Sequence, residues 1–155
     1  MTTSSDCSRP PGSALRLYFD VLACVARADG RYADDERHLL EAAARACDLD
    51  PGAVAEIARV ADPSQPLDMD KILHDAGSKA DASVVVETLR DSYVLASVDN
   101  DISAAEVEVL ERFLTHAGLD EIGRSLLLQW ARTAAEHHLD GLRLIADLRC
   151  DHPQQ

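Results

Sequence analysis

The chain has 155 residues, of which 46% are hydrophobic and 28% are charged, and its formal net charge is −13 at pH 7. This length and composition are typical of one globular domain with its own core, and they argue against a disordered chain. The acidic excess argues against nucleic acid and an anionic membrane surface as direct partners, because both bind through basic groups. Cations and basic proteins remain as candidates.

The sequence predicts an all-α domain after a short tail. Residues 1–12 are rich in Ser, Thr and Pro and predict a flexible N-terminal tail, and residues 13–150 are expected to form the helical domain. Apolar residues at helical spacing predict a single-domain bundle of about seven to eight helices, built from two pseudo-symmetric halves. The halves span about 13–61 and 78–138 and are joined by 62–77, which contains the Pro-rich break at 62–66.

The predicted helices follow one another with recognisable start and stop signals. Asp50 and Pro51 are typical of an N-cap and a first helical residue, and Gly77 is typical of a helix end. The first helix is expected to end near Ala28. The later helices are expected at about 34–47, 51–60, 69–77, 82–98 and 103–117. Asp120 is expected to cap a seventh helix, and Leu139, Leu142, Ile145 and Ala146 suggest a final one.

Apolar stripes identify the inward faces expected for these helices. The last two helices are expected to be separated at Asp140-Gly141. The stripe of the second helix consists of Leu39, Leu40, Ala43 and Cys47. The stripe of the seventh helix consists of Ile122, Leu126, Trp130 and Ala134. The stripe of the final helix consists of Leu139, Leu142, Ile145 and Ala146.

One acidic stretch is present twice. Residues 28–36 read ADGRYADDE, and residues 98–106, which lie 70 positions later, read VDNDISAAE. The same offset also aligns Leu40 with Leu110. One fixed offset through several pairs indicates an internal duplication.

Each copy of this stretch predicts a helix, a tight turn and a second helix. Gly30 and Asn100 stand where the first helix ends, a position whose left-handed backbone favours Gly or Asn. Residues 103–106 form a capping box at the start of the second helix. Both copies therefore have an Asp at the end of one helix and a Glu in the first turn of the next: Asp29 with Glu36, and Asp99 with Glu106.

If the two copies face each other, four carboxylates converge on one site. Carboxylates about 5 Å apart repel by about 3 kcal/mol per pair at an effective dielectric near 20, a large loss for a marginally stable fold. A bound divalent cation or a basic partner would offset it, and oxygen ligands favour Ca²⁺ or Mg²⁺ over Mn²⁺ and Zn²⁺. The predicted metal ligands are Asp29, Glu36, Asp99 and Glu106, with Asp34, Asp35 and Asp101 as secondary candidates.

Structural roles account for part of the same pattern. Glu106 completes a capping box, and Asp29 and Asp99 can act as solvated turn formers. This account does not cover Glu36, because its N-cap counterpart is Ala33, a poor cap. The stretch from Asp99 also lacks the Gly and the Glu that define an EF-hand loop. The shared acidic site and the purely structural roles both stay open.

The repeated motif resembles the TerB-like domain of tellurite-resistance proteins. The resemblance rests on the Asp29-Gly30 pair with Glu36 seven residues after Asp29, following an amphipathic Ala-rich helix and repeated in the second half, and it covers about Leu15 to His138. It implies an all-helical fold whose acidic pairs bind metal, a link to stress and phage-defence systems, and a location near the inner membrane. Asn100 departs from the family's Gly.

We therefore expect a non-enzymatic acidic module that binds a divalent cation and acts as a scaffold with other proteins of a tellurite-resistance-type stress-response complex. The alternative is a metal-independent domain that recognises basic partners through the same acidic face. A two-metal hydrolase is the weakest hypothesis, because no His or Lys base stands beside the carboxylates in sequence. Four scattered cysteines and the lack of a signal peptide or apolar span predict a cytoplasmic protein, peripheral to the inner membrane only through partners.

Overall fold

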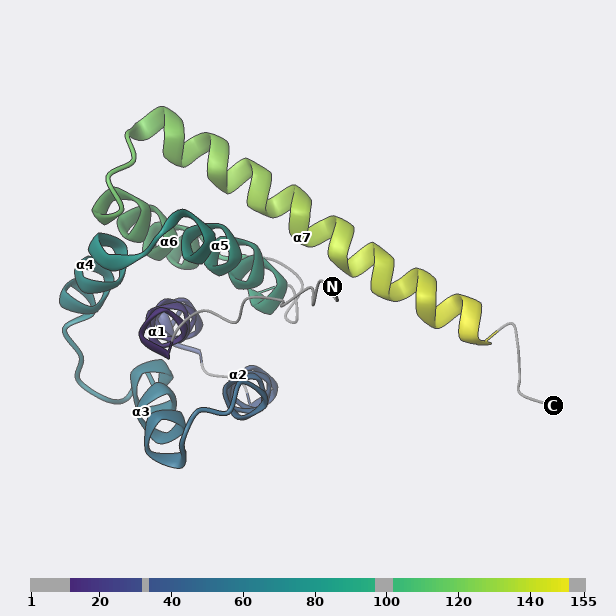
Figure 1. Ribbon diagram of the computed structural model, residues 1–155, viewed down its shortest axis with the longest axis horizontal. Helices are drawn as coiled ribbons and strands as arrows, with labels where there is room; N and C mark the ends of the chain where they lie inside the picture. The colour runs from purple at the N-terminus through teal and green to yellow at the C-terminus, as the bar shows by residue number, and fades with distance from the viewer. Residues whose placement is uncertain (1–11, 32–33, 97–101, 151–155) are drawn as a thin grey trace, which may run out of the picture.

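The computed structural model describes residues 12–31, 34–96 and 102–150, and within these ranges it contains seven α-helices and no β-strand (Figure 1). The all-α class predicted from the sequence is confirmed, and the predicted N-terminal tail lies almost entirely outside the described ranges. The helices are α1 (Gly12–Arg27), α2 (Asp34–Ala46), α3 (Pro51–Ala61), α4 (Met69–Lys79), α5 (Ala82–Ala96), α6 (Ala104–His116) and α7 (Glu121–Cys150).

Helix α1 is the centre of the bundle. Residues 21–26, which read VLACVA, are all buried, with at most 4% of any residue exposed. A helix that is apolar around its whole circumference is stable only when other elements cover every side. Helices α3, α4, α5 and α6 pack against α1, and α2 touches it more lightly. Figure 1 accordingly shows α1 between the α2–α3 pair and helices α4 to α6.

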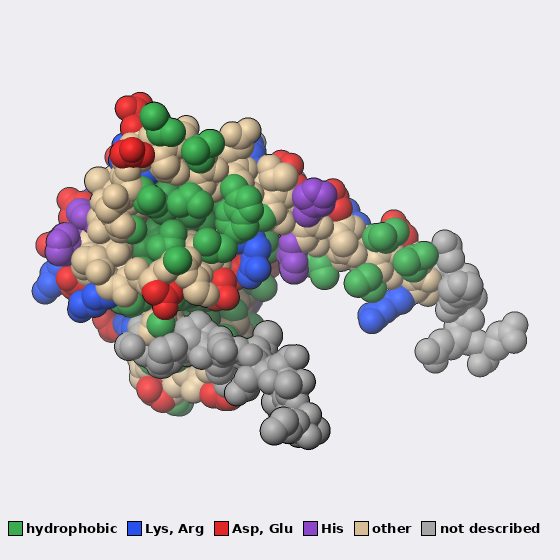
Figure 2. Space-filling view, turned by 45° about the horizontal axis from the view of Figure 1, so that its top comes forward, with side chains coloured by type: hydrophobic (Ala, Val, Ile, Leu, Met, Phe, Trp, Pro, Cys, Tyr) green, Lys and Arg blue, Asp and Glu red, His purple; other side chains and the backbone are tan. Residues whose placement is uncertain are grey.

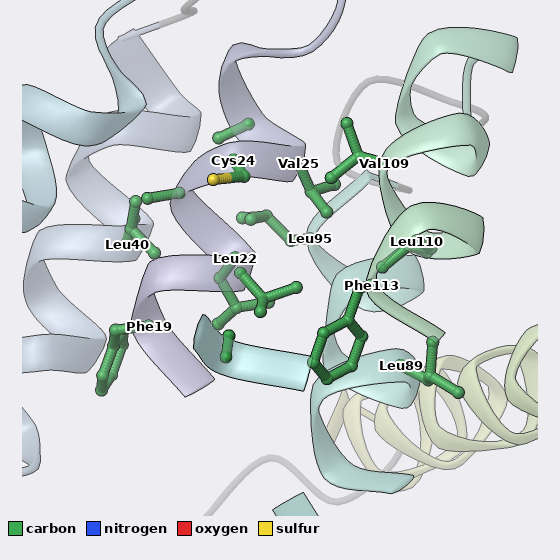
Figure 3. Packing of buried hydrophobic residues seen from close by; sticks show 14 of the residues in the cluster. Phe19, Leu22, Cys24, Val25, Leu40, Leu89, Leu95, Val109, Leu110 and Phe113 are labelled. Atoms are coloured by element: carbon green, nitrogen blue, oxygen red, sulfur yellow. The ribbon is translucent and has the colours of Figure 1, made fainter. Parts of the chain in front are cut away.

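The core extends to both sides of α1. Figure 3 shows Leu40 of α2 on one side of this helix and Leu110 and Phe113 of α6 on the other, with Val25 of α1 between them. Each of these four residues is at most 2% exposed. Since only 4% of the chain is aromatic, most of the core consists of Leu, Val and Ala side chains, as the composition predicted.

The boundaries of several helices recur at an offset of 70 residues. Helices α2 and α6 occupy residues 34–46 and 104–116, and α3 and α7 begin at residues 51 and 121. After both α2 and α6 the chain turns through a residue with positive φ, Asp48 at 58° and Gly118 at 89°. Both turns have the backbone hydrogen bonds of a Schellman motif. Helices α2 and α6 therefore begin and end at positions 70 residues apart, whereas α3 and α7 share only the starting position.

Helix α4 does not end at Gly77, as the sequence predicted, but continues to Lys79. Gly77 is buried where α4 meets α6. A Cβ at this position would lie 2.6 Å from the Cβ of His116 and 2.7 Å from the carbonyl oxygen of Phe113. The glycine therefore allows a close approach of two helices rather than a helix end. The inward position predicted for Leu39 is also wrong, because this residue is 45% exposed.

Helix α7 differs most from the expectation. It is one helix of 30 residues without a break at Asp140-Gly141, and its projecting end extends beyond the bundle (Figure 1). Helix α7 packs mainly against α5, and its buried residues are Leu128, Ala131 and Ala135. The predicted apolar stripe does not face the core, because three of its members, Ile122, Leu126 and Trp130, are 72%, 62% and 43% exposed.

A polar contact joins the central helix to the second half of the chain. The Oη of Tyr18 in α1 donates a hydrogen bond of 2.6 Å to Asp91 Oδ2 in α5, and Arg90 Nε donates one of 2.8 Å to the other carboxylate oxygen. Burial of Tyr18 and its bond to Asp91 raise the pKa of the phenol above its ordinary value. The hydroxyl therefore stays a donor throughout the physiological pH range.

We expect Tyr18→Phe to lower the free energy of unfolding by about 1–2 kcal/mol, because a partly buried hydrogen bond to a charged acceptor is lost. Urea denaturation followed by circular dichroism would measure the change. The same measurement on Asp91→Asn and on the double variant tests the pairing. The double variant should lose less than the sum of the two single losses, and simple additivity would contradict the contact.

Candidate functional site

Two glutamates are buried in the described part of the chain. Glu36 is 3% exposed and Glu106 is 4% exposed. Each is the third residue of its helix, Glu36 in α2 and Glu106 in α6. Burial of a carboxylate is strongly unfavourable unless hydrogen bonds or opposite charges compensate the charged form. Both positions therefore need a compensating group.

At Glu106 the capping box supplies much of that compensation. The backbone N–H of Ser103 donates to Glu106 Oε2 at 2.7 Å, and the N–H of Glu106 donates to Ser103 Oγ at 3.2 Å. The position near the helix N-terminus also favours a negative charge. The predicted capping box is thus confirmed, and one carboxylate oxygen of Glu106 is committed to it.

At Glu36 the helix begins with three consecutive acidic residues. Asp34 and Asp35 are exposed, and Asp34 Oδ1 pairs with Arg37 Nη2 at 3.1 Å, with 80% of the Asp34 side chain exposed. Glu36 alone turns inward. It does have an interaction partner, so it is not an isolated buried charge. Its N-cap counterpart, Ala33, lies outside the described residues.

Asp29 lies in the exposed turn after α1. Its Oδ1 accepts the backbone N–H of Arg31 at 2.8 Å, and Gly30 between them has a φ of 73°. The left-handed backbone conformation predicted for Gly30 is confirmed. The hydrogen bond from Arg31 N–H, two residues further along the chain, makes Asp29 a turn-forming residue. A carboxylate that accepts one backbone hydrogen bond keeps further lone pairs for a cation.

The structure describes three of the four predicted metal ligands: Asp29 in its turn, and Glu36 and Glu106 at their helix starts. Asp99, together with Asn100 and Asp101, lies outside the described residues. Within the ranges that are described, no three acidic, His or Cys side chains are grouped so that they could hold a metal ion. The convergence of the two acidic pairs therefore stays a prediction.

The burial of the two glutamates was not among the sequence-based predictions, although the sequence contains a signal for it. Glu36 stands four residues before Leu40, and Glu106 four residues before Leu110, so each shares a helix face with a leucine. Both leucines are at most 2% exposed. In the first half, this position on the buried stripe distinguishes Glu36 from Asp34 and Asp35, which lie two residues and one residue earlier and face solvent.

Comparison with known families gives one match. The family model of tellurite resistance protein TerB matches residues 17–121, from α1 to the first residue of α7, and confirms the resemblance noted in the sequence. Nearly all of α7 lies beyond the match. No curated protein and no solved structure matches the chain at a significant level. None of the described helices combines the length and the apolarity that crossing a membrane requires.

Proposed function

Because this chain belongs to the family of tellurite resistance protein TerB, we propose that it is a non-enzymatic module that binds a divalent cation and acts as a scaffold for other proteins of a tellurite-resistance-type stress-response complex. The proposed ligands are Asp29 and Glu36 from the first half and Asp99 and Glu106 from the second. The burial of Glu36 and Glu106 at the same position of two helices supports this proposal most directly.

The donor set fits a hard cation. It consists of carboxylate oxygens only, which favours Ca²⁺ or Mg²⁺ ahead of Mn²⁺ and Zn²⁺. Asp29 follows the C-terminal end of α1, where the helix dipole disfavours a negative charge, and a cation would offset that interaction.

Thermal unfolding with and without divalent ions tests the proposal. At a free ion concentration ten times the Kd, binding should raise the free energy of unfolding by about 1.4 kcal/mol, which corresponds to a Tm increase of roughly 3–6 °C. The measurement uses a chelator and then Ca²⁺, Mg²⁺, Mn²⁺ or Zn²⁺ in turn. If none of the four ions raises the Tm, the cation site is contradicted.

Asp29→Asn combined with Asp99→Asn should abolish the response to the ion. In chelator this double variant should be more stable than the wild type, because carboxylate repulsion is reduced. The matched control is Glu41→Gln with Glu111→Gln, which removes the same charge from an acidic pair that also recurs 70 residues apart. The control should keep the full response, and equal losses in both variants would point to net charge instead of a site.

The exposed carboxylates of Asp29, Asp34 and Asp35 favour one alternative, a metal-independent surface for basic partners. In that case the Tm does not respond to chelator or divalent ions, and binding of the partner weakens as salt is added. Turnover on a panel of phosphoesters in the presence of the stabilising ion would contradict the non-enzymatic assignment and would favour a two-metal hydrolase.

A further inference from the structure

Helix α7 carries an exposed stripe on the face that points away from α5. At 100° per residue, the stripe lies roughly opposite the buried face formed by Leu128, Ala131 and Ala135. All members of this α7 stripe are exposed: Leu126, Trp130, His137, Gly141, Leu144 and Leu148. The four large apolar members are between 43% and 62% exposed. Figure 2 shows hydrophobic side chains on the projecting end of the helix.

The α7 stripe is arranged symmetrically about His137. Trp130 and Leu144 lie seven residues before and after it, and Leu126 and Leu148 lie eleven residues before and after it. A two-fold contact between identical chains requires a self-complementary surface, in which residue i meets residue j and j meets i. Antiparallel helices that cross at His137 meet this condition, with Trp130 opposite Leu144 and Leu126 opposite Leu148.

Gly141 has no explanation within the described fold but fits this pairing. Gly is the least favourable helix residue after Pro. A Cβ added to Gly141 would meet nothing within 4 Å, so packing does not require a glycine there. In the antiparallel pair, Gly141 stands one turn before Leu144 and leaves room for the indole of Trp130 from the second copy. The smallest member of the stripe thus lies one turn from the residue opposite its largest side chain.

The distribution of charge favours a second copy over a basic partner. The chain has a net charge of −13, yet α7 has four acidic residues and four arginines and is neutral. Some of these charges are paired within the helix, Arg132 with Glu136 at 3.9 Å and Arg143 with Asp140 at 3.4 Å. Two acidic copies can therefore approach along α7 without the repulsion that other surfaces would cause.

We infer that α7 is a self-association helix through which two copies of this chain pair antiparallel across a two-fold axis at His137. The stripe from Leu126 to Leu148 is about 33 Å long, and half the circumference of a helix is about 17 Å, so each copy buries about 550 Å². The total of about 1,100 Å² is at the lower end for specific interfaces and corresponds to a weak, concentration-dependent dimer. The contact lies outside the region that matches TerB.

Cysteine cross-linking tests the register. In a background of Cys7→Ser and Cys150→Ser, His137→Cys should form a disulfide between chains on mild oxidation. Leu148→Cys alone should not, because its two copies lie about 33 Å apart in the antiparallel pair. Leu126→Cys together with Leu148→Cys should cross-link again. Efficient cross-linking of Leu148→Cys alone, or cross-linking of His137→Cys no faster than of the exposed control Ala42→Cys, would overturn the inference.

Analytical ultracentrifugation tests the interface without covalent bonds. Leu144→Glu should weaken the dimer at least tenfold, whereas Ala146→Glu, which adds the same charge to the opposite face of the projecting segment, should change the Kd less than twofold. Both variants should keep the helicity of the wild type. Gly141→Leu should also weaken the dimer although it adds apolar surface. A stronger dimer for Gly141→Leu, or a wild type that remains monomeric at about 100 µM, would overturn the inference.

Discussion

Replacing Gly77 with Ala is expected to lower the free energy of unfolding by about 2–3 kcal/mol. The sign of this change in the free energy of unfolding is informative, because Gly→Ala inside a helix ordinarily raises stability by about 0.5–1 kcal/mol. At Gly77 the new Cβ would lie 2.6 Å from the Cβ of His116 and 2.7 Å from the carbonyl oxygen of Phe113. These atoms belong to the backbone of α6 or are fixed to it, so they cannot rotate away, and α4 would have to move off α6.

Thermal and urea unfolding would measure the effect of Gly77→Ala, with an expected Tm decrease of roughly 5–10 °C. Gly141→Ala is the matched control, because an added Cβ there meets nothing within 4 Å. The control should be neutral or slightly stabilising. A Gly77→Ala variant as stable as the wild type would show that the two helices separate at little cost, contrary to the close packing of α4 on α6.

The second large effect concerns alkaline pH. The Cys24 side chain in α1 is buried, with 0% of the residue exposed, and burial raises the pKa of its thiol to about 12. In the unfolded chain a thiol loses its proton near pH 8.5. Above that pH the unfolded state binds fewer protons than the folded state, so the free energy of unfolding falls as pH rises. The loss amounts to about 1.4 kcal/mol per pH unit and ends where the folded thiol itself ionises.

Urea denaturation between pH 7 and pH 10 would measure this slope. Cys24→Ala should flatten the fall between pH 9 and pH 10 by about 1.4 kcal/mol per pH unit. Readings above pH 10 would also contain the effect of Tyr18, whose partly buried phenol has a raised pKa. Cys47→Ala, at a half-buried position, is the control and should keep the slope of the wild type. Equal slopes in all three proteins would contradict a protonated buried thiol at Cys24.

Local signals in the sequence predicted the helices well because their chemistry is local. The Asp50-Pro51 start of α3 and the capping box at Ser103 appear in the structure as the sequence indicated. Gly77 was misjudged because glycine serves both helix ends and close helix contacts, and only the position of α6 decides between them. The inward face of α7 was misjudged for a related reason. Helix α7 has one stripe of large apolar residues, which includes Leu126 and Trp130, and a second stripe on which two of the three buried residues are alanines. Helix α5 packs against the second stripe.

The candidate site was predictable in part. The acidic pairs follow from the repeat, and the inward direction of Glu36 and Glu106 follows from the leucines four residues later on the same helix faces. Whether two pairs separated by 70 residues meet depends on how the helices carrying them are arranged in space. Spacing along the chain carries no information on that arrangement, and Asp99 lies outside the described residues.

The central position of α1 also bears on how the molecule unfolds. Helix α3 covers one flank of α1, and α4, α5 and α6 cover the others, so the two halves of the chain share one interior around this helix. Removal of the second half of the chain would expose the apolar segment at residues 21–26, which belongs to the first half, to water. The first half is thus thermodynamically dependent on the second, and the bundle is expected to lose its structure in a single cooperative transition instead of one half at a time.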